Sequence, residues 1–365
     1  MRIVYLNPTG HLGGAERALL DLMAGVRAAN PDWRLTLITT ADGELVAQAR
    51  TLGVAAAVVP LPPSIARLGD AGAGGPAGNQ TALWRVIGRL CAAAPAMGFY
   101  SRKLGMAIAD AQPDLVHSNG FKMHVLGAWS APRGTPLLWH IHDYVRARPM
   151  MSRLLRLHSR RCALMVANSK SVAADVRAAL GVRTPIFAVY YGIDLEHFSP
   201  AGNRSDLDAL AGMMPLGEGG LRIIGLVTTM ARWKGHETFL RAQGFTGFVD
   251  DAAAAMRSLD VVVHASTEPE PFGLVIVEAM ACGKALIASP AGGAGELVVD
   301  EVNALAHRPG DAASLARQIV RLAGDPELRA RLGKAGLAMA AQRFSRARIA
   351  ADMTPIYREF ANGAS

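Results

Sequence analysis

Cysteine is scarce in this sequence, and long apolar runs are missing from it. The chain has 365 residues and three cysteines, Cys91, Cys162 and Cys282, which show no paired spacing and no C-x-x-C motif. This pattern excludes a disulfide scaffold, and we expect buried free thiols in a reducing cytoplasm. The first apolar run has only four residues, so we expect no signal peptide. No uninterrupted apolar stretch reaches the ~20 residues of a membrane span.

Acidic residues are scarce in the first half of the chain. Residues 1–200 contain 21 Lys and Arg against 12 Asp and Glu, whereas the remainder contains 17 against 18. The excess is concentrated between Arg146 and Cys162, where six arginines are interleaved with Met and Leu and no acid occurs. Such a segment is typical of a helix lying on anionic lipid or of a solvated helix with snorkelling arginines. Stacking aromatics and nucleic-acid motifs are missing from it, so we expect no nucleic-acid partner.

Short β-rich runs alternate with longer helical patterns along the chain. One series of strand-like runs covers residues 2–7, 35–40, 55–61, 114–119, 136–144 and 164–169, and a second covers 222–229, 260–266 and 285–289. This alternation predicts two doubly wound α/β domains with parallel sheets, facing a cleft. We expect a first domain over residues 1–195, a turn-rich linker over 196–220 and a second domain over 221–344. Ligands of such sheets bind at the carboxyl ends of the strands.

The segment EPEPFGLVIVEAMACGKALIAS combines two carboxylates with an apolar run. Pro271 suits the first turn of a helix, so a helix start at Phe272 and Gly273 would present unpaired amides to an anion. Glu278, inside the apolar run, would be costly to bury unless a polar ligand paired with it. A sugar nucleotide meets both needs, because its hydroxyls bind carboxylates and its diphosphate suits a helix start.

This segment resembles the E-x7-E signature of the retaining glycosyltransferases of family four, with Glu270 and Glu278 at the required spacing. The resemblance runs from residue 1 to about residue 344 and implies the GT-B fold, with two Rossmann-like domains. It implies that Glu270 positions the hydroxyls of the donor sugar and that Glu278 holds the ribose. Phe272, Gly273 and Leu274 would then lie beside the donor. The tail, residues 345–365, suits the terminal helix that crosses back to the first domain.

Two motifs of the first half support the same resemblance. GGAER follows the first strand, and its Gly13 and Gly14 resemble the glycine loop of the family near the donor phosphates and the acceptor. The pattern is not G-x-G-x-x-G, so we predict no nicotinamide site. In LLWHIHDY, His142 corresponds to the histidine near the donor sugar, and His140 is the less favoured choice.

The opening of the second half, GLVTTMARWKGHETFLRA, resembles the phosphate-binding stretch of the family. Lys234 falls on the lysine that neutralises the leaving diphosphate. The arginine that usually precedes this lysine by four or five residues is Thr229 here, which is a departure from the family. Arg232 would reach the same phosphate, or Thr229 would donate a hydrogen bond to it.

A stretch that the family carries is missing after Gln243. A strand and a helix normally precede the segment similar to GFVDD, but here Gln243 runs directly into Gly244. Losing an interior strand would expose unpaired edges of its neighbours. We therefore expect that residues are missing between Gln243 and Gly244, and a genuine deletion is the alternative.

The donor and acceptor follow from the resemblance. Asp-x-Asp, the metal motif of many sugar transferases, occurs only at residues 206–208 in the predicted linker, where it suits a helix start, so we expect no metal at the site. The family implies a UDP- or GDP-sugar donor, no cofactor, and retaining transfer of a hexose-type sugar. We expect a glycan or lipid-linked acceptor in cell-envelope or polysaccharide synthesis. The basic segment suggests a cytoplasmic protein with peripheral contact at the inner face of an anionic membrane.

Two other functions stay open at this point. A nucleotide-sugar epimerase of the same two-domain shape would bind the same donor without needing an acceptor surface. A non-catalytic nucleotide-sugar-binding subunit would be consistent with the departure at Thr229. Incubation with UDP- and GDP-sugars separates these possibilities, since the products would be transferred sugar, interconverted sugar or none.

Overall fold

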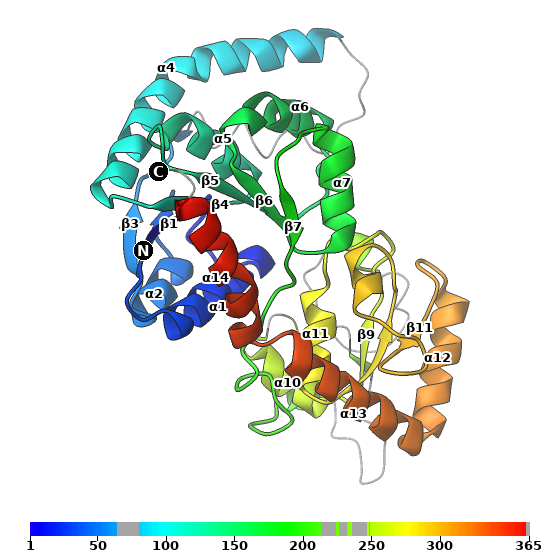
Figure 1. Cartoon of the computed structure of the whole chain (residues 1–365). Coiled ribbons are helices and arrows are strands. Elements are labelled where there is room, and N and C mark those ends of the chain that lie inside the picture. The colour runs from blue at the N-terminus through cyan, green and yellow to red at the C-terminus, as the bar shows by residue number, and fades with distance from the viewer. Residues whose placement is uncertain (64–79, 213–223, 226–231, 236–246, 248, 363–365) are drawn as a thin grey trace. The chain divides into compact units, whose positions relative to one another are not determined.

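The chain forms two compact units. A computed structural model describes residues 1–63, 80–212, 224–225, 232–235, 247 and 249–362 (Figure 1). The first unit comprises residues 1–167, 172–189 and 350–365, and the second comprises 168–171 and 190–349. Each unit contains one parallel sheet with helices, as the alternation predicts. Thr229 and the junction of Gln243 with Gly244 lie outside the described residues, so the expectations attached to them stay predictions.

The first sheet is parallel, and its central strands are buried on both faces. Its strands lie in the order β3-β2-β1-β4-β5-β6-β7. They are β1 (Arg2–Asn7), β2 (Arg34–Thr39), β3 (Ala55–Val58), β4 (Leu115–Asn119), β5 (Leu137–Ile141), β6 (Leu164–Ala167) and β7 (Ile186–Ala188). Every residue of β4, β5 and β6 is buried, and near-continuous buried runs are typical of parallel sheets covered on both sides. The carboxyl ends of β1, β4 and β5 therefore meet at one edge.

Helices cover both faces of the first sheet. They are α1 (Gly14–Ala29), α2 (Glu44–Thr51), α4 (Gln80–Asp110), α5 (Phe121–Ser130), α6 (Pro149–His158), α7 (Lys170–Leu180) and most of α14 (Arg346–Asn362). On one face, His124 of α5 stacks on Trp139 of β5 with ring centroids 5.3 Å apart. On the other, the Tyr357 hydroxyl of α14 lies 2.7 Å from His117 Nδ1 of β4. Side chains that alternate along each strand thus reach both layers.

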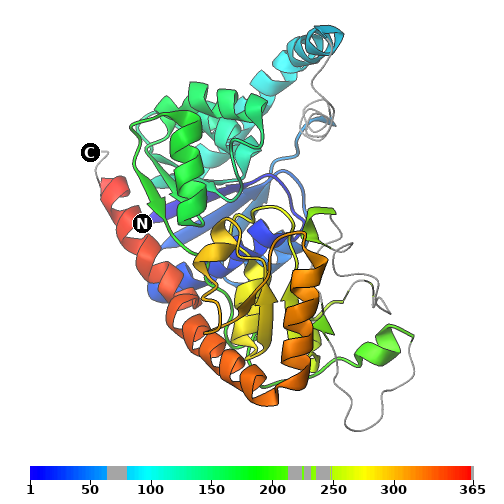
Figure 2. The same cartoon turned by 90° about the vertical axis from the view of Figure 1, so that its right-hand side faces the viewer.

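The second sheet is smaller in its described part. Its strands are β8 (Ile224–Gly225), β9 (Val261–His264), β10 (Ala285–Ala288) and β11 (Leu305–Ala306), in the order β11-β10-β9-β8. Its helices are α8 (Leu207–Leu210), α10 (Ala252–Ser258), α11 (Leu274–Ala281), α12 (Ala312–Gly324) and α13 (Pro326–Arg343). Figure 2 shows α12, in orange, beside these strands. The N-caps Asp311 and Asp325 each accept a backbone N–H three residues on at 2.8 Å, which explains why α12 and α13 start there.

The expected linker is held to the second unit. The division between the units falls after residue 189, earlier than the predicted 195, and residues 190–212 belong to the second unit. Arg257 of α10, which is 5% exposed, donates to the carbonyls of His197 at 2.9 Å and Asn203 at 2.6 Å. Asp206 caps α8 by accepting from the Ala209 N–H at 3.0 Å, so the Asp-x-Asp triplet opens a helix as predicted.

Two predictions from composition can also be compared with the structure. Cys162 and Cys282 are buried free thiols, as expected, whereas the side chain of Cys91 lies outside the described part. None of the helices in the described part of the chain is both long enough and apolar enough to span a bilayer.

Candidate active site

The carboxyl edge of the second sheet holds the buried residue Glu270. It lies in the loop after β9 and pairs through its backbone with the loop after β10. The Glu270 N–H donates to the Ala291 carbonyl at 3.1 Å, and the Gly293 N–H donates to the Glu270 carbonyl at 2.7 Å. The residue is 8% exposed. Two backbone hydrogen bonds thus fix this carboxylate where parallel α/β sheets bind ligands.

Among the described residues, three side chains bind the Glu270 carboxylate. Lys234 donates to Oε1, and His264 Nε2 donates to Oε2. Ser266 Oγ also donates to Oε2, at 2.9 Å. The Lys234 ammonium lies over the Trp233 ring, 4.2 Å from its centroid. The structure therefore brings two of the predicted catalytic residues, Glu270 and Lys234, together in one buried ion pair.

The two other partners of Glu270 were missed by the sequence analysis. His264 is the last residue of β9, and Ser266 follows it by two positions; both are buried. The only available signal was a pair of polar residues closing the apolar run DVVVHAS at a strand end. His264 is held in turn by its carbonyl, which accepts from His307 Nε2 at 3.1 Å and from the Ser289 N–H at 3.0 Å.

These contacts keep Glu270 ionised. Burial by itself raises the pKa of this carboxyl. The hydrogen bond and electrostatic attraction of His264, together with the charge and hydrogen bond of Lys234, outweigh burial and lower the pKa of Glu270 to about 2. The edge therefore offers an ionised carboxylate that is paired with the Lys234 side chain.

The helix that follows Glu270 begins later than predicted. α11 starts at Leu274, with Gly273 as its N-cap in the left-handed region at φ 104°, so a side chain at this position would be strained. Phe272 is 2% exposed, and its ring packs against Tyr191 with centroids 4.8 Å apart. The left-handed backbone of Gly273 excludes it from the helix and explains the later start, while the buried ring of Phe272 packs in the interior. Glu278 is partly exposed in the second turn of α11.

The carboxyl edge of the first sheet places His142 beside two asparagines. His142 follows β5 directly, and its Nε2 donates to Asn119 Oδ1 at the end of β4. Asn119 Nδ2 donates to Asn7 Oδ1 at the end of β1, at 2.7 Å. Asn7 Nδ2 then donates to Glu16 Oε1 at 3.4 Å, and Glu16 Oε2 accepts from the Gly13 N–H at 3.2 Å. The predicted site residues His142 and Gly13 are thus joined by a chain of hydrogen bonds.

The neighbouring histidines are neutral groups of the sheet interior. His140 is 1% exposed, and its Nδ1 lies 3.2 Å from His117 Nε2. Burial lowers the pKa of His140 and of His124 to about 3. Burial, followed by the nearby histidines, also lowers the pKa of His142 well below its usual value. His142 is the partly exposed member of the pair, in keeping with the preference for it over His140.

The side chain of Arg232 is not described, and the carboxylate of Glu296 binds the start of a helix. The 3₁₀ turn Arg232–Lys234 is present, but the described part of the chain does not include the Arg232 side chain. Glu296 accepts from the Lys170 and Ser171 N–H groups at 3.0 and 2.7 Å, and so satisfies the start of α7. Within the described ranges, no three His, Cys, Asp or Glu side chains are placed to hold a metal ion.

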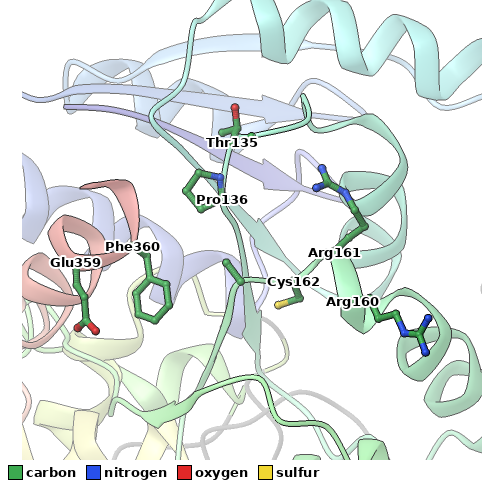
Figure 3. Close-up of a pocket in the computed structure, with 9 residues that line it drawn as sticks. Thr135, Pro136, Arg160, Arg161, Cys162, Glu359 and Phe360 are labelled. Atoms are coloured by element: carbon green, nitrogen blue, oxygen red, sulfur yellow. The ribbon is translucent and has the colours of Figure 1, made fainter. Parts of the chain in front are cut away.

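A cavity in the first unit lies at the opposite ends of the strands. Its volume is about 510 Å³, and it is lined by the residues just before β5 and β6 together with the end of α14. Figure 3 shows Glu359 and Phe360 on one side and Arg160 and Arg161 on the other. Because ligands of parallel sheets bind at carboxyl ends, this cavity at the amino ends is separate from the candidate site.

Comparison with known proteins decides the family. The sequence model described as Glycosyltransferase Family 4 matches residues 12–197, and the one described as Glycosyl transferases group 1 matches residues 220–339. The chain belongs to glycosyltransferase family 4. A phosphatidyl-myo-inositol mannosyltransferase of Mycobacterium leprae is 37% identical over 171 residues, which are 44% of this chain and 43% of that enzyme. A D-inositol 3-phosphate glycosyltransferase of Nocardiopsis dassonvillei is 27% identical over 63% of this chain and 68% of its own.

Solved structures support the GT-B fold of this glycosyltransferase. Anabaena Alr3699/HepE, solved in complex with UDP and glucose, aligns with a TM-score of 0.76 at 25% identity, over 98% of this chain and 99% of that one. The sucrose-phosphate synthase of Thermosynechococcus elongatus aligns with a TM-score of 0.74 at 20% identity, over the whole of both chains. Two parallel-sheet α/β units and these neighbours confirm the predicted fold. The chain spans less than half of the length of the first curated relatives that it matches.

Proposed function

We propose that this glycosyltransferase is a retaining, metal-independent enzyme that moves a hexose-type sugar from a UDP- or GDP-sugar to an acceptor hydroxyl. The observation that carries the proposal is the buried ion pair of Glu270 and Lys234 at the carboxyl edge of the second sheet. A cation beside an ionised carboxylate offers one group to a diphosphate and another to sugar hydroxyls. The UDP and glucose bound to the Anabaena neighbour support a nucleotide-sugar donor.

In this mechanism the charge of the departing diphosphate is met by Lys234. The bond between the anomeric carbon and the phosphate oxygen breaks, and its electron pair leaves with the diphosphate. The acceptor oxygen bonds to the same face of the sugar, and its proton passes to a phosphate oxygen of the donor. Lys234 is 13% exposed in its side chain, so its attraction for the developing charge is weakly screened. Arg232 and Thr229 would add to this charge stabilisation.

Glu270 positions the donor sugar and polarises the reacting centre. It acts as an anion rather than as a proton donor, because its pKa of about 2 keeps it ionised at any working pH. Glu278 would hold the ribose, and the backbone at Phe272, Gly273 and Leu274 would lie beside the donor. In the first unit, Gly13 and Gly14 would approach the phosphates and the acceptor, and His142 would contact the donor sugar.

Product analysis with purified protein tests this function. We expect transfer, or slow donor hydrolysis, with UDP- or GDP-sugars in the presence of EDTA, and an α-configured product from an α-configured donor by NMR. Interconverted sugar would indicate an epimerase, and binding without turnover would indicate a non-catalytic subunit. Inversion at the anomeric carbon, or activity that EDTA abolishes, would contradict the stated mechanism.

The acceptor we propose is a glycan or a lipid-linked molecule of the cell envelope. The first unit carries a face suited to an anionic membrane, formed by the outward side of α6. Met150 and Leu157 are 59% and 70% exposed there; Arg153 of the same helix and Arg160 of the 3₁₀ turn that follows it, Ser159–Arg161, are also exposed. Trp129 of α5, 40% exposed, lies beside α6 through its contact with His158. Apolar and cationic side chains interleaved on one face are typical of helices that lie on anionic lipid.

The charge around α6 also supports contact with an anionic membrane. Residues 115–174 contain nine Lys and Arg and a single acid, Asp143, which is paired with Arg148 at 2.9 Å. We propose a cytoplasmic enzyme that contacts the inner face of the membrane through this face. The M. leprae relative, named for a phosphatidyl-inositol acceptor, supports a lipid-linked substrate.

Liposome sedimentation tests the membrane contact. We expect the parent protein to sediment with vesicles that contain anionic lipid and not with vesicles of neutral lipid. The double variant R153E/R160E should bind at least tenfold more weakly, since each cation near an anionic surface contributes about 1 kcal/mol. R317E/K334E changes the net charge equally on exposed helices of the second unit and serves as the control. Equal binding by the two variants, or indifference of the parent to lipid charge, would remove the proposal.

A further inference from the structure

The two oxygens of the Glu270 carboxylate are bound from different parts of the second unit. His264 Nε2 and Ser266 Oγ donate to Oε2, the latter at 2.9 Å, whereas the Lys234 ammonium donates to Oε1. Because a carboxylate only accepts hydrogen bonds, Nε2 of the His264 ring carries a proton. Oε2 is thus bound by the end of β9 and the loop after it, and Oε1 by the 3₁₀ turn that contains Lys234.

The partner on Oε2, His264, is fixed in the sheet interior. Its side chain is 4% exposed, and its backbone pairs in register with Ala288 of β10. Its carbonyl accepts from His307 Nε2 at 3.1 Å and from the Ser289 N–H at 3.0 Å. These contacts fix the position from which the ring reaches the carboxylate.

The partner on Oε1, Lys234, has a fixed backbone but a side chain that can move. The Trp233 carbonyl accepts from the Thr267 N–H at 2.8 Å, which holds the turn against the loop after β9. A Cβ on Gly235 would lie 1.8 Å from the Ala265 carbonyl oxygen, so the backbone of the turn also packs closely there. The ammonium, however, ends a flexible aliphatic stem, and the side chain is 13% exposed. Lys234 is therefore the partner of the carboxylate that can exchange.

A bound diphosphate competes with Glu270 for the Lys234 ammonium. Removing one partner from a buried charge is strongly unfavourable unless other groups compensate for the loss. We infer that His264 is a positioning residue that keeps the Glu270 carboxylate in place and ionised when Lys234 passes from Oε1 to the diphosphate of the donor. The inference rests on the proposed function, because it assumes that a diphosphate reaches this edge.

The electrostatics of Glu270 support this division between a fixed and an exchangeable partner. Burial raises the pKa of its carboxyl, and the hydrogen bond and electrostatic attraction of His264 lower that pKa more than those of Lys234 do. Glu270 is 8% exposed, so these interactions are weakly screened by solvent. When Lys234 moves to the diphosphate, the larger of the two compensating interactions therefore stays in place.

A double-mutant cycle of nucleotide affinity tests the inference, measured by calorimetry with UDP and GDP. H264L removes the N–H donor to Oε2 and leaves an apolar side chain. With Lys234 present, the nucleotide would withdraw the ammonium from a carboxylate that lacks His264, so we expect H264L to weaken binding roughly 10- to 100-fold. In the K234A background no ammonium is withdrawn, and H264L should weaken binding at most about threefold. A purely structural role of the ring would give equal factors in both backgrounds.

Two further variants separate the lost hydrogen bond from a general loss of packing. H264Q places an amide N–H group near the position of Nε2 and should recover most of the affinity that H264L loses. N303A is the matched control, because Asn303 is fully buried in the same unit and its amide donates to the Leu297 carbonyl at 2.9 Å. It should change the nucleotide affinity by the same factor with and without Lys234.

A crystal structure of the parent with bound nucleotide tests the inference even where a variant fails to fold. We expect the Lys234 ammonium on the diphosphate and His264 Nε2 still on Glu270 Oε2. Equal factors in both backgrounds, or a complex in which Lys234 stays on Oε1, would overturn the inference, and sugar transfer by the parent would then leave the proposed function intact. If the nucleotide binds as expected but no sugar is transferred, the proposed function fails while the role of His264 stands. If no nucleotide binds, both fail.

Discussion

Replacing Glu270 by glutamine tests whether the buried carboxylate acts as a fixed anion. Glutamine keeps the shape of the side chain, but its amide presents an N–H group where Lys234 or His264 already donates. One of these donors would lose its acceptor, and the ion pair with Lys234 would disappear. We therefore expect E270Q to destabilise the second unit as well as to impair transfer.

The size of the effect follows from the pKa of Glu270, which lies at about 2 in the folded protein instead of the usual 4.5. At 1.36 kcal/mol per pH unit, this difference corresponds to about 3 kcal/mol of stabilisation at neutral pH. Because the folded pKa is the lower one, the stabilisation is fully present above pH 4.5 and is lost as the pH falls through 2. Less than half of it remains at pH 3. The side chain is 10% exposed, so solvent screening removes little of it.

Urea titration followed by hydrogen-exchange mass spectrometry measures the second unit by itself, through peptides that cover β9 and α11. E301Q is the control. Glu301, like Glu270, pairs with a basic side chain, here that of Arg321, but the Glu301 side chain is 47% exposed. That exposed pair should contribute less than about 1 kcal/mol. Equal free energies of unfolding for E270Q and the parent at pH 7, or a difference that does not shrink by pH 3, would refute the reasoning.

The remaining predictions concern turnover, nucleotide affinity and backbone space. Lys234→Ala should lower kcat about 100-fold in a donor-hydrolysis assay, since it removes the cation proposed to meet the leaving charge, and an unchanged kcat would contradict that role. Glu278→Ala should weaken UDP or GDP binding about tenfold by calorimetry if it holds the ribose. Gly293→Ala places a Cβ 2.0 Å from the Pro271 carbonyl oxygen and should destabilise the second unit by about 1–3 kcal/mol. Gly324→Ala, which meets open space, should leave its thermal unfolding nearly unchanged.

The architecture was predictable because buried strands appear in the sequence as short apolar runs. Runs such as DLVHSN and DVVVHAS are short and mostly apolar, and they alternate with helical patterns, which is sufficient to predict parallel sheets. Glu270 and Lys234 could be selected as candidates from the sequence, since the motifs around them are local. Their direct pairing was not, because it joins residues 36 positions apart.

What the sequence could not predict depends on neighbours that are remote along the chain. Asn119 contacts both Asn7 and His142 only because the sheet order places β4 between β1 and β5. Nothing within DLVHSN indicates that its last residue lies between Asn7 and His142. In the same way, α11 begins at Leu274 because Gly273 is left-handed, and the Phe272 ring before it packs on Tyr191 and on Phe344 at the end of α13, with centroids 4.8 and 6.1 Å apart. Such contacts are set by the tertiary structure and override the local signal of Pro271.

The two sheet edges differ in charge, and this difference has a physical origin. At the first edge, buried histidines and amides contact one another with no cation–anion pair among His142, Asn119 and Asn7, so burial keeps the histidine neutral. At the second edge, the hydrogen bonds and charges of His264 and Lys234 outweigh the desolvation of Glu270 and keep this carboxylate ionised. Neutral groups select hydroxyls by the direction of their hydrogen bonds, whereas charged groups also attract phosphate. We therefore propose that the first edge contributes neutral hydrogen bonds to the sugar, whereas the second contributes Glu270 for sugar hydroxyls and Lys234 for the diphosphate.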